Sequence, residues 1–272
     1  MHDLNVKNES LRSFLKKLGS VAVAFSAGVD STFLLKTAQE VLGEKAVAIT
    51  ARSVFIPARE QEEALLFCRR HGIRHLVVDA DVLAIEDVAE NPPDRCYRCK
   101  KALFTLFLNE AGKLGIPYVV EGSNLDDLGD YRPGLKAISE LGILSPLREA
   151  GLKKQEIRML SREMGLPTWD KPSFACLASR FVYGEQIDPQ KLSMVEKAEE
   201  KLRSMGLLQL RVRLHGDLAR IEAEPEQISF LAENRKEICE CFHGLGFRYV
   251  TLDLDGFASG SMNKSLGEAS LR

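Results

Sequence analysis

The chain has 272 residues, of which 45% are hydrophobic and 28% charged, and its formal net charge is −2 at pH 7. This composition belongs to a globular protein of one large or two ordinary domains, and it excludes disorder and a coiled coil. The near-neutral charge provides no global basic field for nucleic acid, and no apolar run approaches the roughly 20 residues that span a bilayer. Residues 1–17 lack the apolar core of a signal peptide. We therefore expect a cytoplasmic protein that binds a small molecule, with no nucleic acid and no membrane.

Predicted strands and helices alternate through the first part of the chain. Strands are expected at residues 21–26, 46–51, 75–79 and 118–122, and helices at 11–18, 32–42, 58–71, 98–114 and 155–165. Parallel strands need helix-sized connections, so this order predicts an α/β fold with a parallel sheet and helices on both faces. Ligands of such sheets bind at the carboxyl ends of the strands.

A linker with Gly and Pro, residues 183–189, ends the regular alternation of strands and helices. Beyond it we expect a helix at 190–205, strands at 210–214, 219–223 and 247–254, and a helical stretch at 225–245. Residues 210–214 (LRVRL) alternate apolar and basic side chains, as a half-exposed strand does. We expect residues 1–185 to form the sheet domain and residues 186–272 a small α+β domain for substrate binding and oligomerisation.

The turn after the first predicted strand reads SAGVDS, from Ser26 to Ser31. It resembles the PP-loop of the ATP pyrophosphatase family, usually written SGGxDS. The resemblance implies that backbone N–H groups around Gly28 and Val29, with the two serine hydroxyls, hold a phosphate of ATP, and that Asp30 holds Mg²⁺. Ala27 stands where the family usually has Gly, and its methyl group fits if φ is negative. Without the resemblance, these residues are an ordinary helix cap after a strand.

Three of the six cysteines have spacing or surroundings that suggest chemistry. Cys96 and Cys99 lie three residues apart at the start of a predicted helix, so both thiols share one face. Cys176 follows in an irregular segment, with Arg180 nearby to favour the thiolate. Three thiolates could bind an iron–sulfur cluster or a zinc ion. The alternative for Cys96 and Cys99 is a structural pair or a thiol redox motif, and the alternative for Cys176 is a small buried side chain.

The other cysteines, Cys68, Cys239 and Cys241, lack ligand spacing. We expect all three to be packing residues.

Segments spread over nearly the whole chain carry a more specific resemblance. The motifs are AFSAGVDS at the loop and residues 129–137, 172–184, 210–222 and 246–263. Together they resemble a LarE-type ATP-dependent sulfur transferase. The resemblance implies an enzyme of nickel-pincer nucleotide biosynthesis, whose cofactor serves lactate racemase and related isomerases. It would adenylate a carboxylate of pyridinium-3,5-dicarboxylate mononucleotide, and sulfur would then displace AMP to leave a thiocarboxylate.

A substrate with a phosphate and two carboxylates calls for guanidinium groups. Arg211 and Arg213 alternate with Val212 and so share one strand face, which is a solvated face if they bind nothing. The resemblance implies that both bind substrate or nucleotide phosphate, with Glu222 on the same surface.

Three further basic residues are candidates beside these. Arg180 is a candidate for substrate binding and Arg132 is a lesser one. Lys100, beside the cysteines, is a lesser candidate for catalysis, with a turn or a surface charge as the alternative for Arg132 and Lys100.

Two subtypes of this family differ in the source of sulfur. In one, the counterpart of Cys176 gives up its own sulfur and the protein acts once. In the other, three cysteines hold a [4Fe-4S] cluster that carries an extra sulfide, and Cys96 and Cys99 place this chain there. Inorganic sulfide or a donor protein would supply the sulfur, and relatives form homo-oligomers. The alternatives are a sacrificial Cys176, a PP-loop tRNA thiolase or GMP-synthetase-like ligase, and a nucleotide-binding regulator that senses redox state or iron.

Overall fold

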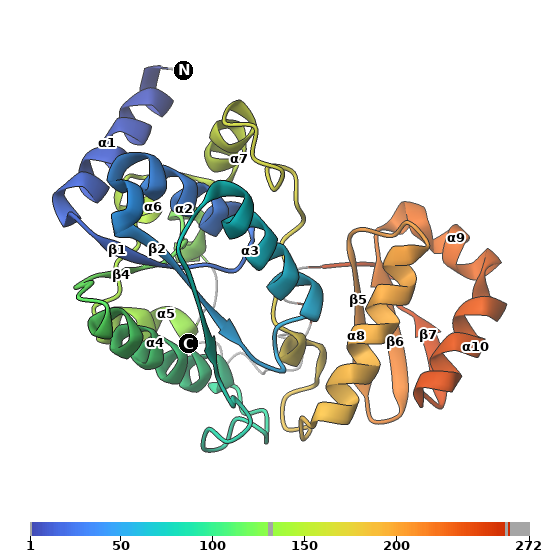
Figure 1. Ribbon diagram of the computed structural model, residues 1–272. Helices are drawn as coiled ribbons and strands as arrows, with labels where there is room; N and C mark the ends of the chain where they lie inside the picture. Colours follow the sequence, from blue (N-terminus) through green and yellow to red (C-terminus); the bar gives the residue numbers. More distant parts are fainter. Residues whose placement is uncertain (1, 130–132, 259–260, 262–272) are drawn as a thin grey trace. The chain divides into compact units, whose positions relative to one another are not determined.

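The structure is a computed structural model that describes residues 2–129, 133–258 and 261 (Figure 1). The chain forms two compact units, one from Met1–Asp81 and Cys96–Phe174 and the other from Val82–Arg95 and Ala175–Arg272. The segment 82–95 therefore belongs with the later part of the chain. This division falls at other positions than the boundary expected after residue 185.

A parallel sheet of four strands is the centre of the first unit, in the order β3-β2-β1-β4. The strands are β1 (Val21–Ala24), β2 (Ala46–Arg52), β3 (His75–Asp79) and β4 (Val119–Val120). β1 pairs in parallel with β2, where Val21 lies opposite Ala46, and with β4, where Ala22 lies opposite Val119. The predicted α/β fold is confirmed, although β4 is shorter than the expected 118–122.

Helices cover both faces of this sheet (Figure 1). They are α1 (His2–Leu18), α2 (Val29–Leu42), α3 (Ala58–His71), α4 (Arg95–Lys113), α5 (Pro133–Glu140), α6 (Pro146–Glu149) and α7 (Lys154–Glu163), with the short 3-10 turns η1 (Gly43–Lys45) and η2 (Leu125–Gly129). Alternate residues of β1 enter different apolar clusters, because Val21 and Val23 pack with α1, α2 and α3 while Ala22 packs with α4. A strand buried on both faces explains the continuous apolar run of the sequence.

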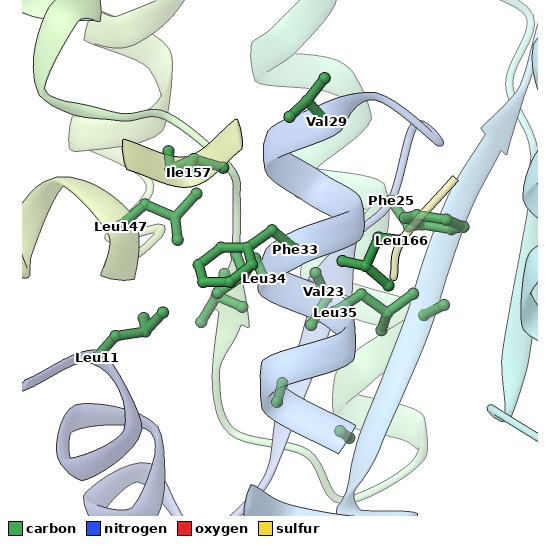
Figure 2. Close-up of a cluster of buried hydrophobic side chains, with 14 of the residues drawn as sticks. Leu11, Val23, Phe25, Val29, Phe33, Leu34, Leu35, Leu147, Ile157 and Leu166 are labelled. Carbon is green, nitrogen blue, oxygen red and sulfur yellow. The ribbon is translucent and has the colours of Figure 1, made fainter. Parts of the chain in front are cut away.

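The helix that follows the SAGVDS turn is fixed by the larger apolar cluster (Figure 2). Phe33, Leu34 and Leu35 of α2 are fully buried among side chains of α1, α6 and α7. Cys68 of α3 lies in the same cluster, and burial raises the pKa of its thiol to about 12. The packing role predicted for Cys68 is thereby confirmed.

The second unit is a small α+β unit with a three-stranded sheet in the order β5-β6-β7. Its strands are β5 (Leu210–His215), β6 (Leu218–Ala223) and β7 (Tyr249–Leu252), and its helices are η3 (Leu177–Arg180), α8 (Pro189–Ser204), η4 (Pro225–Gln227), α9 (Ile228–Glu233) and α10 (Arg235–Leu245). β6 pairs antiparallel with β5 and parallel with β7. The Asp188 carboxylate caps α8 by accepting the N–H of Lys191 at 2.8 Å.

The predicted helical stretch 225–245 is confirmed: it consists of η4, α9 and α10, with a break at Asn234 between α9 and α10. One expectation about this unit is wrong. The strand predicted to be half-exposed is buried from Leu210 to Leu214, both arginines included. The arginines can be buried because carboxylates and carbonyls of the same unit surround them.

Candidate functional site

The turn from Ser26 to Ser31 lies at the carboxyl end of β1, where it leads into α2. The two serine hydroxyls lie 3.1 Å apart, and the Ser31 hydroxyl donates to the carbonyl of Gly28 at 3.3 Å. The first α-helical hydrogen bond runs from the N–H of Thr32 to that carbonyl at 2.9 Å, and no side chain caps the helix. The N–H groups that precede it, those of Val29, Asp30 and Ser31, have no acceptor within the helix, and the helix dipole favours an anion there.

Ala27 adopts a conformation that the sequence argument did not anticipate. Its φ is +54°, in the left-handed region, so the condition of a negative φ is not met. An L-residue pays free energy in this region, whereas Gly does not. The carbonyl oxygen of Ala27 accepts a hydrogen bond from the Lys171 ammonium at 3.0 Å.

Asp30, in the first turn of α2, is held by two side chains from distant segments. Its Oδ1 accepts from the amide of Asn124 at 3.4 Å, and its Oδ2 forms an ion pair with the ammonium of Lys154 at the start of α7. Sequence reasoning missed Asn124 and Lys154. The position of Lys154 at the first residue of a helix gives no hint that its side chain reaches Asp30.

Two carboxylates, those of Asp126 and Asp127, support these contacts. Asp127 accepts the N–H of Asn124 at 2.9 Å, and Asp126 accepts the N–H of Lys154 at 2.8 Å. Both therefore fix the backbone of the residues that hold Asp30.

The end of β4 also lies against the turn. A Cβ atom on Gly122 would come within 3.0 Å of the Ser31 nitrogen, so only Gly fits there without movement. The turn thus offers N–H groups without a helical acceptor, serine hydroxyls, a carboxylate oxygen for a hard cation and an ammonium within reach. This set fits the phosphates and Mg²⁺ of a nucleotide.

Cys96 and Cys99 lie in the first turns of α4, and both are half-buried. Tyr97 and Lys101 of the same helix connect it to Glu140 of α5. The Tyr97 hydroxyl donates to Glu140 at 2.7 Å, and the Lys101 ammonium donates to that hydroxyl at 2.8 Å. A Cβ atom on Gly134 would come within 2.5 Å of Cδ of Lys100, so the stem of Lys100 lies directly on this glycine.

Cys176 precedes η3 in the second unit and is half-buried. The guanidinium of Arg180 holds its backbone, because Nη1 donates to the carbonyl of Ala175 at 2.7 Å and to that of Cys176 at 3.1 Å. The fully buried side chain of Arg180, 0% exposed, also donates twice to Glu199 of α8, at 2.8 and 2.9 Å. The structure thus places Arg180 in an ion pair that supports the Cys176 segment.

Glu199 accepts further hydrogen bonds from Arg203 at 3.2 Å and from the N–H of Val212 at 3.1 Å. Burial alone would raise the pKa of Glu199, but Arg180, with Arg203 and Arg211, outweighs it and lowers that pKa to about 2. This carboxylate is therefore ionised at any ordinary pH.

Arg211 and Arg213 point to the same face of β5, as predicted, and both are buried. Arg213 donates twice to Glu222 of β6, at 3.0 and 2.9 Å, and also to the hydroxyl of Ser261 at 2.9 Å. Arg211 lies over the ring of Phe257, 5.0 Å from its centroid. Burial, followed by the charge of Arg180, lowers the pKa of Arg211 to about 9.

Five arginines gather around β5 with acidic side chains among them. Arg180, Arg203, Arg211, Arg213 and Arg220 interact with Glu199, Glu222 or Asp253. Guanidinium groups bind carboxylates and phosphates through paired N–H donors, so this cluster is the candidate site for an anionic ligand.

Asn91, which precedes α4, and Arg95, the first residue of α4, are hydrogen-bonded to the segment after Cys176. The buried amide of Asn91 donates to the carbonyl of Val182 at 2.6 Å and accepts from Arg95, whose guanidinium also donates to the carbonyl of Ala178 at 2.9 Å. Arg95 directly precedes Cys96 in the chain. These bonds lie within the second unit, and they hold the segment 82–95 to the rest of it, a link that the sequence argument missed.

The roles predicted for Arg132 and for the three cysteines remain predictions. Arg132 lies outside the described residues. Within residues 2–129, 133–258 and 261, no group of three or more His, Cys, Asp or Glu side chains is gathered for a metal ion. The donor chemistry of three cysteine thiols fits an iron–sulfur cluster, and Cys96 and Cys99 belong to one unit while Cys176 belongs to the other.

Among the helices of these described residues, none combines the length and the apolar composition that a membrane span requires.

Similarity to known proteins extends over the full chain. No family model matches. An uncharacterized protein of Synechocystis is 45% identical over 97% of this chain and 99% of its own length. One subunit of a glutamine-hydrolyzing GMP synthase of Thermoplasma acidophilum is 28% identical over 73% of this chain and 68% of its own. The pyridinium-3,5-bisthiocarboxylic acid mononucleotide synthase of Lactiplantibacillus plantarum is 39% identical over 100% of this chain and 99% of its own. Identity at this level over both units shows that the chain is an enzyme and belongs to the family of pyridinium-3,5-bisthiocarboxylic acid mononucleotide synthases, the LarE family of PP-loop proteins.

Proposed function

We propose that this enzyme uses ATP to convert a carboxylate of a pyridinium-3,5-dicarboxylate mononucleotide into a thiocarboxylate. The name of the Lactiplantibacillus plantarum relative supports the substrate and product. The observation that carries the proposal for this chain is the arrangement of Asp30 between Asn124 and Lys154 at a helix start whose first N–H groups have no helical acceptor. The product would be a precursor of a nickel-pincer cofactor, made in the cytoplasm by a homo-oligomer.

In the first step, a carboxylate oxygen of the substrate attacks the α-phosphorus of ATP. The bond from this phosphorus to the bridging oxygen breaks, and pyrophosphate leaves with the electron pair. The N–H groups of residues 28–31 and the hydroxyls of Ser26 and Ser31 bind the phosphates. Asp30 would hold Mg²⁺, which neutralises phosphate charge when bound. Lys154 then turns from Asp30 to the phosphates and supplies the cation that the loop itself lacks.

The arginines of β5 account for recognition of the anionic substrate. Arg211 and Arg213 bind its phosphate, and Glu222 holds the fork of Arg213 in a fixed orientation. The guanidinium groups gathered around β5 favour an anionic ligand over a neutral one. Arg180 acts through the backbone of Cys176. Arg132 stays a lesser candidate for contact with the substrate, and Lys100 a lesser candidate for catalysis.

In the second step, sulfur attacks the acyl carbon, the bond from this carbon to the oxygen of AMP breaks, and thiocarboxylate and AMP are released. Cys96, Cys99 and Cys176 would hold a [4Fe-4S] cluster, which supplies bound sulfide when present. Inorganic sulfide or a donor protein would replace the sulfur.

The test is anaerobic reconstitution with iron and sulfide, followed by assay with Mg-ATP and the dicarboxylate mononucleotide. We expect several turnovers, release of AMP and pyrophosphate, and an unchanged intact mass of the protein. Cys96→Ala and Cys99→Ala should abolish turnover, while Cys239→Ala, at a half-buried cysteine without ligand spacing, should leave it intact.

Other outcomes select other functions. A single turnover that needs no iron and removes the sulfur of Cys176 makes this residue a sacrificial donor. Consumption of ATP only in the presence of tRNA indicates a tRNA thiolase. Nucleotide binding without any formation of AMP indicates a regulator.

A further inference from the structure

Lys171 is a partly buried cation whose contacts the proposed reaction does not explain. Its side chain is 12% exposed, and its ammonium lies 2.7 Å from Oε2 of Glu60 and 3.0 Å from the carbonyl oxygen of Ala27. It also forms an ion pair with Glu63 of the same helix, α3. An ammonium has three N–H donors, and these three acceptors match them. Lys171 is thus held in one place by α3 and reaches the SAGVDS turn from there.

The carbonyl that it binds belongs to the strained residue of the turn. Ala27 has φ of +54°, a conformation that disfavours L-residues, and it is buried. The same planar peptide unit contains the carbonyl of Ala27 and the N–H of Gly28. Fixing the direction of this carbonyl therefore fixes the opposite direction of the Gly28 N–H, which stands at the start of α2.

We propose that Lys171 is a positioning residue that holds the peptide between Ala27 and Gly28 in the orientation needed for nucleotide binding. The ion pairs with Glu60 and Glu63 hold the ammonium, and the ammonium holds the Ala27 carbonyl. This contact offsets the preference of an alanine for negative φ. With Gly at position 27, the turn adopts a positive φ without strain, so Lys171 matters less. The inference rests on the proposed function in that the loop binds Mg-ATP.

A double-mutant cycle tests this coupling. The Kd for Mg-ATP is measured by calorimetry, without substrate, for the wild type, Lys171→Met, Ala27→Gly and the double variant. We expect Lys171→Met to weaken binding about tenfold with Ala27 present and less than about threefold with Gly at this position. A role of Lys171 in the fold alone weakens binding by the same factor in both backgrounds.

Loss of Lys171 leaves the buried Glu60, 7% exposed, with Arg59 as its ion-pair partner in the described structure. The cycle is therefore repeated with Glu60→Gln in all proteins, so that no buried carboxylate loses its counter-ion. Lys201→Met is the matched control, because Lys201 pairs with Glu237 on the surface of the other unit. It should leave the Kd unchanged.

The outcomes separate this inference from the proposed function. Equal losses in the two backgrounds, or no loss in either, overturn the role of Lys171 while the wild type still binds Mg-ATP. Failure of the wild type to bind Mg-ATP overturns the proposed function and this inference with it. Unequal losses, larger with Ala27, support both.

Discussion

Replacing Glu199 by Gln removes the carboxylate that Arg180 and Arg203 share in the second unit. The side chain keeps its size, but one of its two acceptor oxygens becomes an NH₂ group that faces guanidinium donors. The fully buried Arg180 then lacks its counter-ion. Breaking a buried ion pair from one side costs about 3–5 kcal/mol, because it leaves a buried charge without compensation.

The pKa of Glu199 gives an independent magnitude. Its pKa is lowered from 4.5 to about 2 in the folded protein, so the fold stabilises the ionised carboxylate relative to the neutral carboxyl group. This difference corresponds to about 3 kcal/mol of stability. Since the unfolded chain takes up the proton first on acidification, the contribution is complete above pH 4.5 and is lost as the pH falls towards 2.

Urea titration followed by circular dichroism at several pH values, from about 7 down to about 3, measures both effects. We expect Glu199→Gln to lower the free energy of unfolding of the second unit by about 3 kcal/mol at neutral pH, and the difference from wild type to shrink at low pH. Glu200→Gln, at the exposed neighbouring position, is the control and should change stability by less than about 0.5 kcal/mol. A loss for Glu199→Gln no larger than that of this control, or one independent of pH, would refute the reasoning.

Three further changes test other parts of the structure. Gly122→Ala places a methyl group 3.0 Å from the Ser31 nitrogen and should raise the KM for ATP at least about tenfold by displacing the turn. Gly112→Ala, at a position of α4 with open space around it, should leave the KM for ATP unchanged and stabilise the protein by about 0.5–1 kcal/mol. Equal KM values for the two variants in steady-state assays would contradict this. Cys68→Ala should lower stability by about 1 kcal/mol and leave the iron content after reconstitution unchanged, and a loss of iron would make Cys68 a ligand. Lys154→Met should slow formation of pyrophosphate at least about a hundredfold, and an unaffected rate in a pyrophosphate release assay would remove Lys154 from the site.

The order of strands and helices was predictable because it depends on local patterns. The run of apolar residues before Ser26 and the periodic residues after it define β1 and α2, and this context located the turn. The role of Gly122 as a close contact could not be read from the sequence. Its neighbour in space, Ser31, is far away along the chain, and nothing local distinguishes this glycine from one in a flexible turn.

The cations that complete the site could not be predicted for the same reason. Lys154 and Lys171 reach the turn from more than a hundred residues away, a separation that local sequence patterns do not reveal. The burial of Arg211 and Arg213 was also missed. Alternating charge indicates exposure only when no partner lies across the strand, and Glu222 of β6 is such a partner.

The segment 82–95 has a consequence for the order in which the protein can fold. The chain enters the second unit at residue 82, leaves it after residue 95 and returns at residue 175. During synthesis, Asn91 and Arg95 emerge well before the carbonyls of Val182 and Ala178 to which they bind. A fragment that begins after residue 95 therefore cannot complete the second unit. The short segment 82–95 and the long segment from residue 175 must meet across about eighty intervening residues, a long loop closure of the kind that slows folding.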